Sequence, residues 1–159
     1  MEEKEFVELI KRHSRIIHKL IYLYVDTAED KKDLYQEVLF QAWKSIGTFR
    51  GKAAFSTWLY RVALNTILTF RRKLTVHDPF EHDSEMNISD PQNERSDNSH
   101  RLMMAIRQLN DIDKTIITLH LEDYDNGEIA GITGLSKNNV AVKLHRIKDE
   151  LIHKLRRVA

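Results

Sequence analysis

The sequence of 159 residues contains no cysteine, only two prolines and five glycines, and no long hydrophobic run. Without cysteine it has neither disulfides nor thiolate metal sites, which fits a reducing compartment. Its most apolar stretch, Ile16 to Val25, is interrupted by His18 and Lys19 and is too short to span a bilayer. The N-terminal segment lacks the apolar core of a signal peptide. We therefore expect a cytoplasmic protein of one or two small domains.

Sequence signatures of catalysis are also missing. The eight histidines show no paired ligand spacing, so no metal site is expected. No nucleophile motif, phosphate-cradling glycine loop or dinucleotide fingerprint occurs. The sequence therefore indicates a binding protein without a cofactor rather than an enzyme.

Charge is nearly balanced overall, with a formal net charge of +1, but it is strongly segregated. No carboxylate lies between Glu37 and Asp78, whereas this stretch holds seven cations. The following stretch is acidic, contains both prolines and has few apolar residues, and the chain after Glu128 is basic again. We expect residues 76–99 to form a flexible acidic linker between two basic domains, and nucleic acid is the partner that such basic domains favour.

The first domain, residues 1–75, is predicted to be helical. Apolar residues from Phe6 to Tyr24 recur at intervals of three and four, which places them on one helix face. Asp30 is expected to cap a second helix. The stripe of this second helix is predicted to contain Leu34, Val38, Ala42 and Ser45, beside Leu39 and Ile46.

A third helix is predicted after a loop that Gly47 and Gly51 bracket. Its apolar side is expected to contain Trp58, Val62, Asn65 or Thr66, and Thr69 or Phe70.

The second domain, residues 100–159, is predicted to contain three or four helices. Asp125 and Glu128 have the spacing of a capping box at the start of a short helix, which Gly131 and Gly134 are expected to end. Ser136 is expected to cap the last helix. The core stripe of that helix is predicted to be Val140, Leu144, Ile147, Leu151 and Leu155. A short helix, a glycine turn and a longer capped helix form a helix-turn-helix, so the predicted fold is all-α with two small helical domains.

Two segments together resemble one protein family. The helix Asp33-Leu34-Tyr35-Gln36-Glu37 and the segment Phe55-Ser56-Thr57-Trp58-Leu59 look like region 2 of the extracytoplasmic-function (ECF) sigma factors. Glu128-Ile129-Ala130, Gly134-Leu135-Ser136 and Lys143-Leu144 with Arg146 look like region 4 of that family. The resemblance implies a sigma subunit that binds the largest and second-largest subunits of bacterial core RNA polymerase. Region 2 would then open the promoter −10 element, and region 4 would read the −35 element.

The resemblance also assigns roles to individual residues. From spacing alone, the polar face of the second helix is a solvated surface, whereas the resemblance implies that it contacts polymerase. The residues implied in polymerase binding are Asp33, Gln36, Glu37, Leu39, Phe40 and Gln41, with Trp43 either a contact or a core residue.

For −10 DNA, single strands bind to cationic grooves and stack on aromatic rings. The cations expected there are Arg50, Lys52, Arg61, Arg71 and Arg72; the stacking candidates are Phe55, Trp58 and Tyr60; Ser56 and Asn65 are expected to form hydrogen bonds. Burial in the core is an equally good interpretation of each aromatic residue.

For −35 DNA, Arg and Lys suit guanine, Asn suits adenine, and small apolar groups suit the thymine methyl. The candidates are Ser136, Lys137, Asn138, Asn139, Ala141, Val142, Lys143, His145 and Arg146. Ala141 and Val142 stand where the family usually has a basic and a small polar residue, so promoter preference cannot be carried over from the family.

The main alternative is a stand-alone helix-turn-helix regulator, which would bind duplex DNA without core polymerase. Such a regulator would not need the cationic segment from Phe49 to Lys73, so the sequence favours a sigma factor. The family often has an anti-sigma partner, which no residue here demonstrates. No direct membrane insertion is expected.

Overall fold

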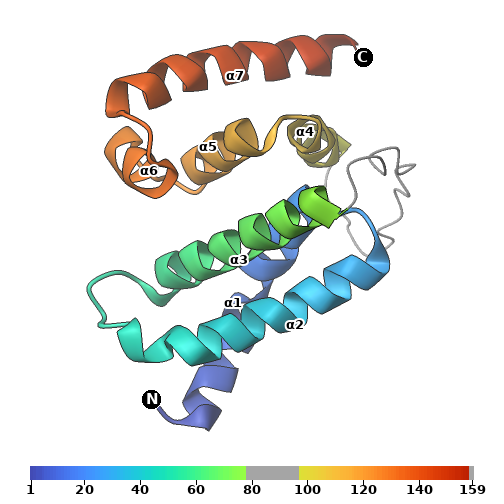
Figure 1. The fold of residues 1–159 in the computed structure, drawn as a ribbon. Helices are drawn as coiled ribbons and strands as arrows, with labels where there is room; N and C mark the ends of the chain where they lie inside the picture. The colour runs from blue at the N-terminus through green and yellow to red at the C-terminus, as the bar shows by residue number, and fades with distance from the viewer. Residues whose placement is uncertain (78–96, 158–159) are drawn as a thin grey trace. The chain divides into compact units, whose positions relative to one another are not determined.

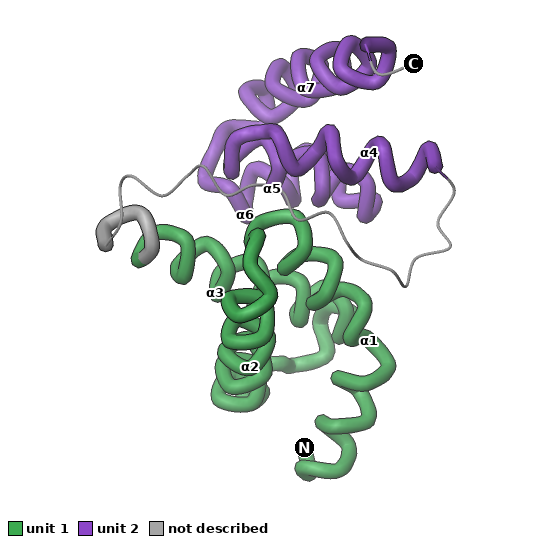
Figure 2. Tube along the Cα trace, turned by 90° about the vertical axis from the view of Figure 1, so that its right-hand side faces the viewer, with its two compact units in different colours: residues 1–89 green, residues 90–159 purple. Residues whose placement is uncertain are grey.

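The computed structural model describes residues 1–77 and 97–157, with side chains described for 1–73 and 97–157. Every regular element in these ranges is a helix, which confirms the all-α prediction (Figure 1). The chain divides into two compact units, residues 1–89 and 90–159 (Figure 2). None of the described helices is both long and apolar enough to cross a membrane.

Unit 1 contains α1 (Glu3–Tyr24), α2 (Ala28–Ser45), the short 3-10 helix η1 (Ile46–Thr48) and α3 (Phe55–His77). The three α-helices pack against one another, and α3 contacts both others (Figure 1). Their shared core contains Ile17 and Leu20 from α1, Leu34, Val38 and Ala42 from α2, and Leu59, Ala63 and Ile67 from α3. Of the stripe predicted for α2, Leu34, Val38 and Ala42 are buried as expected, whereas Ser45 is half-buried.

The start of α2 differs from the sequence prediction. Thr27, not Asp30, is the N-cap, because the Thr27 hydroxyl accepts a hydrogen bond from the Asp30 backbone N–H at 3.1 Å. Asp30 instead lies in the first turn, where its carboxylate interacts favourably with the positive end of the helix dipole. Thr and Asp are both common N-cap residues. The backbone N–H of Asp30 lies in the first turn of α2 and has no partner within the helix, so the side chain three residues before it, Thr27, accepts it.

The buried face of α3 is also displaced from the predicted one. The fully buried residues are Leu59, Ala63, Leu64 and Ile67, whereas Trp58 and Val62 are half-buried. Asn65 and Thr69 are exposed, and the Thr69 hydroxyl donates to the Asn65 carbonyl at 2.8 Å. The buried residues of α3, which also include Tyr60, cover a broad face, and the spacing alone did not fix the centre of that face.

Unit 2 contains α4 (Asp97–Arg107), α5 (Asp111–Leu121), α6 (Asn126–Thr133) and α7 (Lys137–Arg157). Side chains cap three of these helices by accepting a backbone N–H. Asn110 accepts from Asp113 at 2.9 Å, Asp125 from Glu128 at 2.8 Å, and Ser136 from Asn139 at 3.1 Å. The caps predicted at Asp125 and Ser136 are confirmed.

The turn between α6 and α7 depends on Gly134. This residue has a φ of 78°, in the left-handed region, and its N–H donates to the Ala130 carbonyl at 2.9 Å. Only glycine adopts this conformation without steric cost, so Gly134 ends α6. Gly131, which was also expected to end the helix, lies inside it.

α7 packs against α4, α5 and α6 and supplies the core of the helix-turn-helix. Val140, Leu144, Ile147 and Leu151 are buried as predicted, whereas Leu155, the last residue of the predicted stripe, is half-buried. At the far end of α7, the Arg101 guanidinium donates to the Leu155 carbonyl at 2.9 Å. This bond ties α4 to a helix terminus that the cation also suits electrostatically.

The expected linker, residues 76–99, begins and ends within helices, because α3 continues to His77 and α4 starts at Asp97. Residues 78–96 lie outside the described residues.

Candidate nucleic-acid interface

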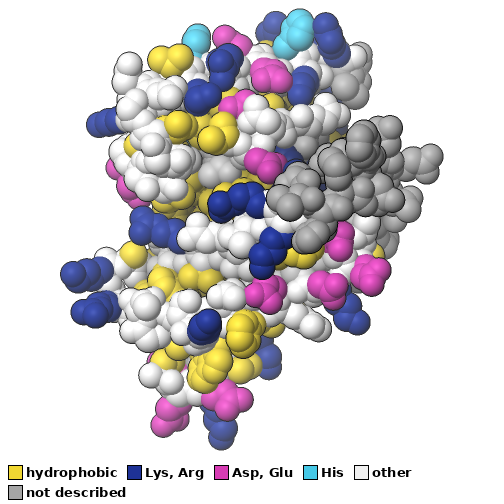
Figure 3. Space-filling view, in the orientation of Figure 1, with side chains coloured by type: hydrophobic (Ala, Val, Ile, Leu, Met, Phe, Trp, Pro, Cys, Tyr) yellow, Lys and Arg dark blue, Asp and Glu magenta, His cyan; other side chains and the backbone are white. Residues whose placement is uncertain are grey.

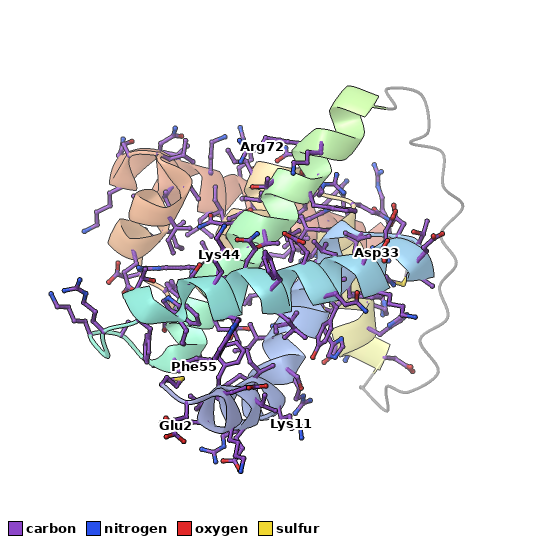
Figure 4. All side chains as sticks on the ribbon, turned by 60° about the horizontal axis from the view of Figure 1, so that its bottom comes forward. Glu2, Lys11, Asp33, Lys44, Phe55 and Arg72 are labelled. Carbon is purple, nitrogen blue, oxygen red and sulfur yellow. The ribbon has the colours of Figure 1, made fainter. Side chains whose placement is uncertain are left out.

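The outer face of α2 is polar at its beginning and apolar toward its end. Asp33, Gln36 and Glu37 are exposed in the first half of the helix, and Figure 4 shows Asp33 near its start. The Gln41 amide donates to Glu37 at 2.9 Å, which fixes both side chains on the surface. Of the predicted polar face, Asp33, Gln36 and Glu37 are exposed and lie away from the buried stripe, whereas Gln41 is half-buried.

Two large apolar side chains complete this surface. Phe40 is 58% exposed and Trp43 is 43% exposed. The Trp43 ring also contacts Phe6 of α1, with 5.0 Å between centroids, so it is both a packing residue and a surface residue. We call Phe40 and Trp43 the α2 apolar patch; Figure 3 shows hydrophobic side chains gathered on this part of unit 1. Leu39, the other predicted anchor, is half-buried.

The loop between η1 and α3 presents positive charge. Arg50 and Lys52 are exposed on it, and Figure 3 shows Lys and Arg side chains projecting from this edge of unit 1. Gly51 between them has a φ of 72° with open space around it, which permits a sharp turn. Arg61, two turns into α3, is also exposed.

Aromatic rings from this loop and from the beginning of α3 pack together in a cluster. Phe49, Phe55 and Trp58 contact one another with centroid separations of 5.4 to 5.7 Å. His13 of α1 lies 5.5 Å from Phe55, which joins the cluster to the rest of the unit. Figure 4 shows Phe55 at the beginning of α3 beside α1. Phe49 is not among the site residues expected from the sequence, although it lies in the loop that Gly47 and Gly51 bracket.

The structure separates the predicted −10 residues into exposed and buried groups. Phe55 and Tyr60 are buried, so their rings are not presented for stacking on bases. Trp58 and Ser56 are half-buried, and Asn65 is exposed on α3. Of the three aromatic candidates, only Trp58 keeps a partly exposed ring beside the cationic loop.

The two arginines at the end of α3 also differ from each other. Arg71 is half-buried and donates a hydrogen bond to the Tyr24 backbone carbonyl at the end of α1. Arg72 is exposed, and Figure 4 shows it near the end of α3. Arg71 therefore has a structural role that the sequence did not reveal.

The outer face of α7 carries the predicted −35 residues. Asn138, Val142 and His145 lie opposite the buried Val140 and Leu144. Lys143 is half-buried, and the other candidates are exposed: Ser136, Lys137, Asn138, Asn139, Ala141, Val142, His145 and Arg146. His145 Nε2 lies 3.6 Å from Asp149, the first carboxylate on the chain after Glu128. The structure thus brings all nine candidates to the beginning of one helix.

Comparison with known proteins identifies the family. The family model for sigma-70 region 2 matches residues 9–76, and that for sigma-70 region 4 matches residues 99–151. The chain is 30% identical to the ECF RNA polymerase sigma-E factor of Haemophilus influenzae, over 97% of this chain and 89% of that protein. It is 31% identical to the RNA polymerase sigma factor SigV of Bacillus subtilis, over 88% of this chain and 84% of that protein.

Among solved structures, the sigma factor RpoE of Bartonella quintana, crystallised with the anti-sigma factor NepR, has the same fold. The TM-score is 0.77 at 17% identity, and the match covers 96% of this chain and 98% of that chain. Two region models in the expected order, together with relatives similar over nearly their full length, establish the assignment. The chain belongs to the ECF sigma factors of bacterial RNA polymerase.

Proposed function

We propose that this sigma factor binds core RNA polymerase through the outer face of α2, opens the −10 element with unit 1 and reads the −35 duplex with α7. The observation that carries the proposal is the pairing, in one chain, of an exposed cationic loop with an exposed recognition helix. A stand-alone regulator needs only the second of these surfaces.

The α2 face suits a basic protein surface. Asp33, Gln36 and Glu37 offer negative charge and hydrogen-bond acceptors, while Phe40 and Trp43 offer exposed apolar area beside them. Interfaces commonly combine a buried aromatic anchor with a polar rim, and charge complementarity adds specificity and association rate. In the family this helix meets the clamp helices of the largest polymerase subunit, and we propose the same role here.

The loop and α3 suit an unpaired DNA strand. Arg50, Lys52 and Arg61 can contact phosphates, Asn65 can form a hydrogen bond with a base, and Trp58 can stack with one. Binding the open strand better than the duplex shifts the equilibrium toward the open promoter, and no chemical step by this chain is needed. Phosphodiester synthesis is left to the polymerase, so the chain acts as an initiation factor and not as a catalyst.

Two further roles rest on the same assignment. The Bartonella quintana protein was solved with an anti-sigma factor, and we propose that a protein inhibitor also regulates this chain. We further propose that it acts in the cytoplasm, where core polymerase and the chromosome are available.

The decisive experiment is transcription in vitro with purified bacterial core polymerase on a library of genomic fragments, with and without the chain. We expect stimulation of a subset of fragments and co-purification of core subunits. If no fragment is stimulated and no core subunit co-purifies, the proposed function is wrong. Binding of the isolated chain to a palindromic duplex, without any effect on core polymerase, would favour the regulator instead.

The cationic loop is tested by the double variant Arg50→Ala/Lys52→Ala. Each phosphate contact to a single strand contributes about 0.7 to the slope of log affinity against log salt concentration. With both cations removed, the slope measured for promoter opening should therefore become shallower by up to about 1.4. The matched control is Lys4→Ala/Lys11→Ala, which removes the same charge from exposed positions of α1. An equal change of slope in both double variants would show that only net charge matters and not the loop.

A further inference from the structure

Val142 is the most exposed of the large hydrophobic side chains in the described part of the chain, at 60%. It lies on α7, where Val140, Leu144, Ile147 and Leu151 face the core. At 3.6 residues per turn, Val142 lies about 200° around the helix from Val140 and therefore near the centre of the outer face.

Folding does not explain a valine at this position. The side chain is exposed, so it adds little to the core, and a β-branched residue forms helix less readily than alanine. Its neighbours on the outer face are polar: Asn138 lies one turn before it and Arg146 one turn after it, and both are exposed. An apolar group is thus presented at the centre of a polar, cationic surface.

The position of Val142 along α7 places it within reach of DNA bases. It lies five residues after the first residue of α7, which is about 7.5 Å along the axis. Recognition helices contact base edges with their N-terminal residues, and the major groove is about 12 Å wide. Ile152, the other exposed large apolar residue of α7, lies about 22 Å from the same end.

The major groove offers one apolar group, the 5-methyl of thymine. We propose that Val142 is a specificity-determining residue of this sigma factor and contacts the 5-methyl group of a thymine in the −35 duplex. The polar neighbours Asn138 and Arg146 then bind the adjacent base edges or phosphates, as adenine and guanine edges allow. This inference rests on the proposed function, because it assumes that α7 enters the −35 major groove.

The test uses holoenzyme assembled from core polymerase and the full chain. The −35 segment of a stimulated promoter is randomised, and the preferred sequence is selected by transcription. Each thymine of the selected −35 duplex is then replaced by deoxyuridine, which removes the methyl group and leaves every hydrogen-bonding group in place. Promoter affinity is measured for wild type, Val142→Ala and Ile152→Ala.

We expect one or two thymine positions at which deoxyuridine lowers wild-type affinity about fourfold, the equivalent of about 0.8 kcal/mol for one buried methyl group. In Val142→Ala the same replacement should have no effect, whereas Ile152→Ala should keep the fourfold loss. Both substitutions remove an exposed apolar group from the same helix, so they are matched in their effect on folding.

Two different failures are distinguishable. If a preferred −35 sequence is selected but deoxyuridine has the same effect in wild type and in Val142→Ala at every position, this inference is wrong and the proposed function stands. If no −35 sequence is enriched although core polymerase is bound, the role proposed for α7 is wrong and this inference falls with it.

Discussion

We expect replacement of glycine by alanine to have opposite effects on stability at two positions of the helix-turn-helix. Gly131 lies inside α6, and a Cβ there would have no atom within 4 Å. Gly134 also has open space around it, but its φ of 78° lies in the left-handed region. Replacement by alanine therefore differs at the two positions only in backbone conformation.

The magnitudes follow from backbone physics. A glycine inside a helix is less favourable than alanine by about 0.5–1 kcal/mol, because glycine loses more conformational entropy on folding. A non-glycine residue in the left-handed region costs about 1–2 kcal/mol. Gly131→Ala should stabilise the chain and Gly134→Ala should destabilise it, with a difference of about 1.5–3 kcal/mol between the variants. Gly134→Asn should lose less than Gly134→Ala, because asparagine tolerates this conformation better.

The assay is urea unfolding of the full chain followed by circular dichroism, with amide hydrogen exchange to locate the effect in α6 and α7. Neither glycine has a side chain, so no contact is removed in either variant. If Gly134→Ala is as stable as wild type, then the turn does not require the left-handed conformation. If Gly131→Ala is less stable than wild type, then Gly131 is not a helical position at which a Cβ is accommodated without a clash.

Three further outcomes are expected. Phe40→Ala should weaken co-purification of core polymerase about tenfold, as loss of an interface hot spot does. The control Val7→Ala removes a side chain that is 41% exposed on α1 and should change co-purification by less than about twofold. Equal losses in the two variants would contradict the role of the α2 apolar patch. The hydrogen bond from the Glu128 backbone N–H holds the pKa of Asp125 below its ordinary value of 3.8. The stability that Asp125 contributes is therefore present above that ordinary value and is lost as the pH falls through the lowered pKa. Asp125→Asn keeps a cap but cannot titrate, so urea midpoints measured from pH 7 to pH 3 should fall less steeply than in wild type, and an unchanged profile would refute this origin. Asn110→Ala should lower the free energy of unfolding by about 1 kcal/mol because it removes the cap of α5, and urea unfolding at pH 7 measures it; no loss would mean that water replaces the cap.

Most of the fold could be predicted because helical periodicity is a local signal. Most of the residues predicted for the buried stripes of α2 and α7 were correct, because the buried residues of each helix lie on one narrow face, but Ser45 and Leu155 are only half-buried. The caps at Asp125 and Ser136 were also correct, because a polar side chain followed three residues later by the start of a helix has few other uses. The face of α3 was placed incorrectly because the buried residues between Leu59 and Ile67 cover a broad face, and spacing alone does not show where the centre of such a face lies.

The candidate site was harder to predict than the fold, because exposure depends on packing between distant segments. Composition indicated correctly that the stretch from Glu37 to Asp78 is cationic, but it could not separate the half-buried Trp58 from the buried Phe55 and Tyr60. The contact between Phe55 and His13 of α1 joins positions far apart in the chain. No pattern within the helix itself predicts such a contact.

Arg71 shows how this distinction changes the experiment. Next to Arg72 in the sequence it is one more cation, and removing both charges is the natural test of strand opening. In the structure its guanidinium donates to the Tyr24 carbonyl and joins the end of α3 to the end of α1. Loss of Arg71 would therefore weaken unit 1 and DNA binding together, and slower opening could not be assigned to either cause. Arg50 and Lys52 are exposed on a loop next to the aromatic cluster, so their charge can be removed while Phe49, Phe55 and Trp58 keep their contacts. The loop pair, and not the arginine pair, is the informative test of strand opening.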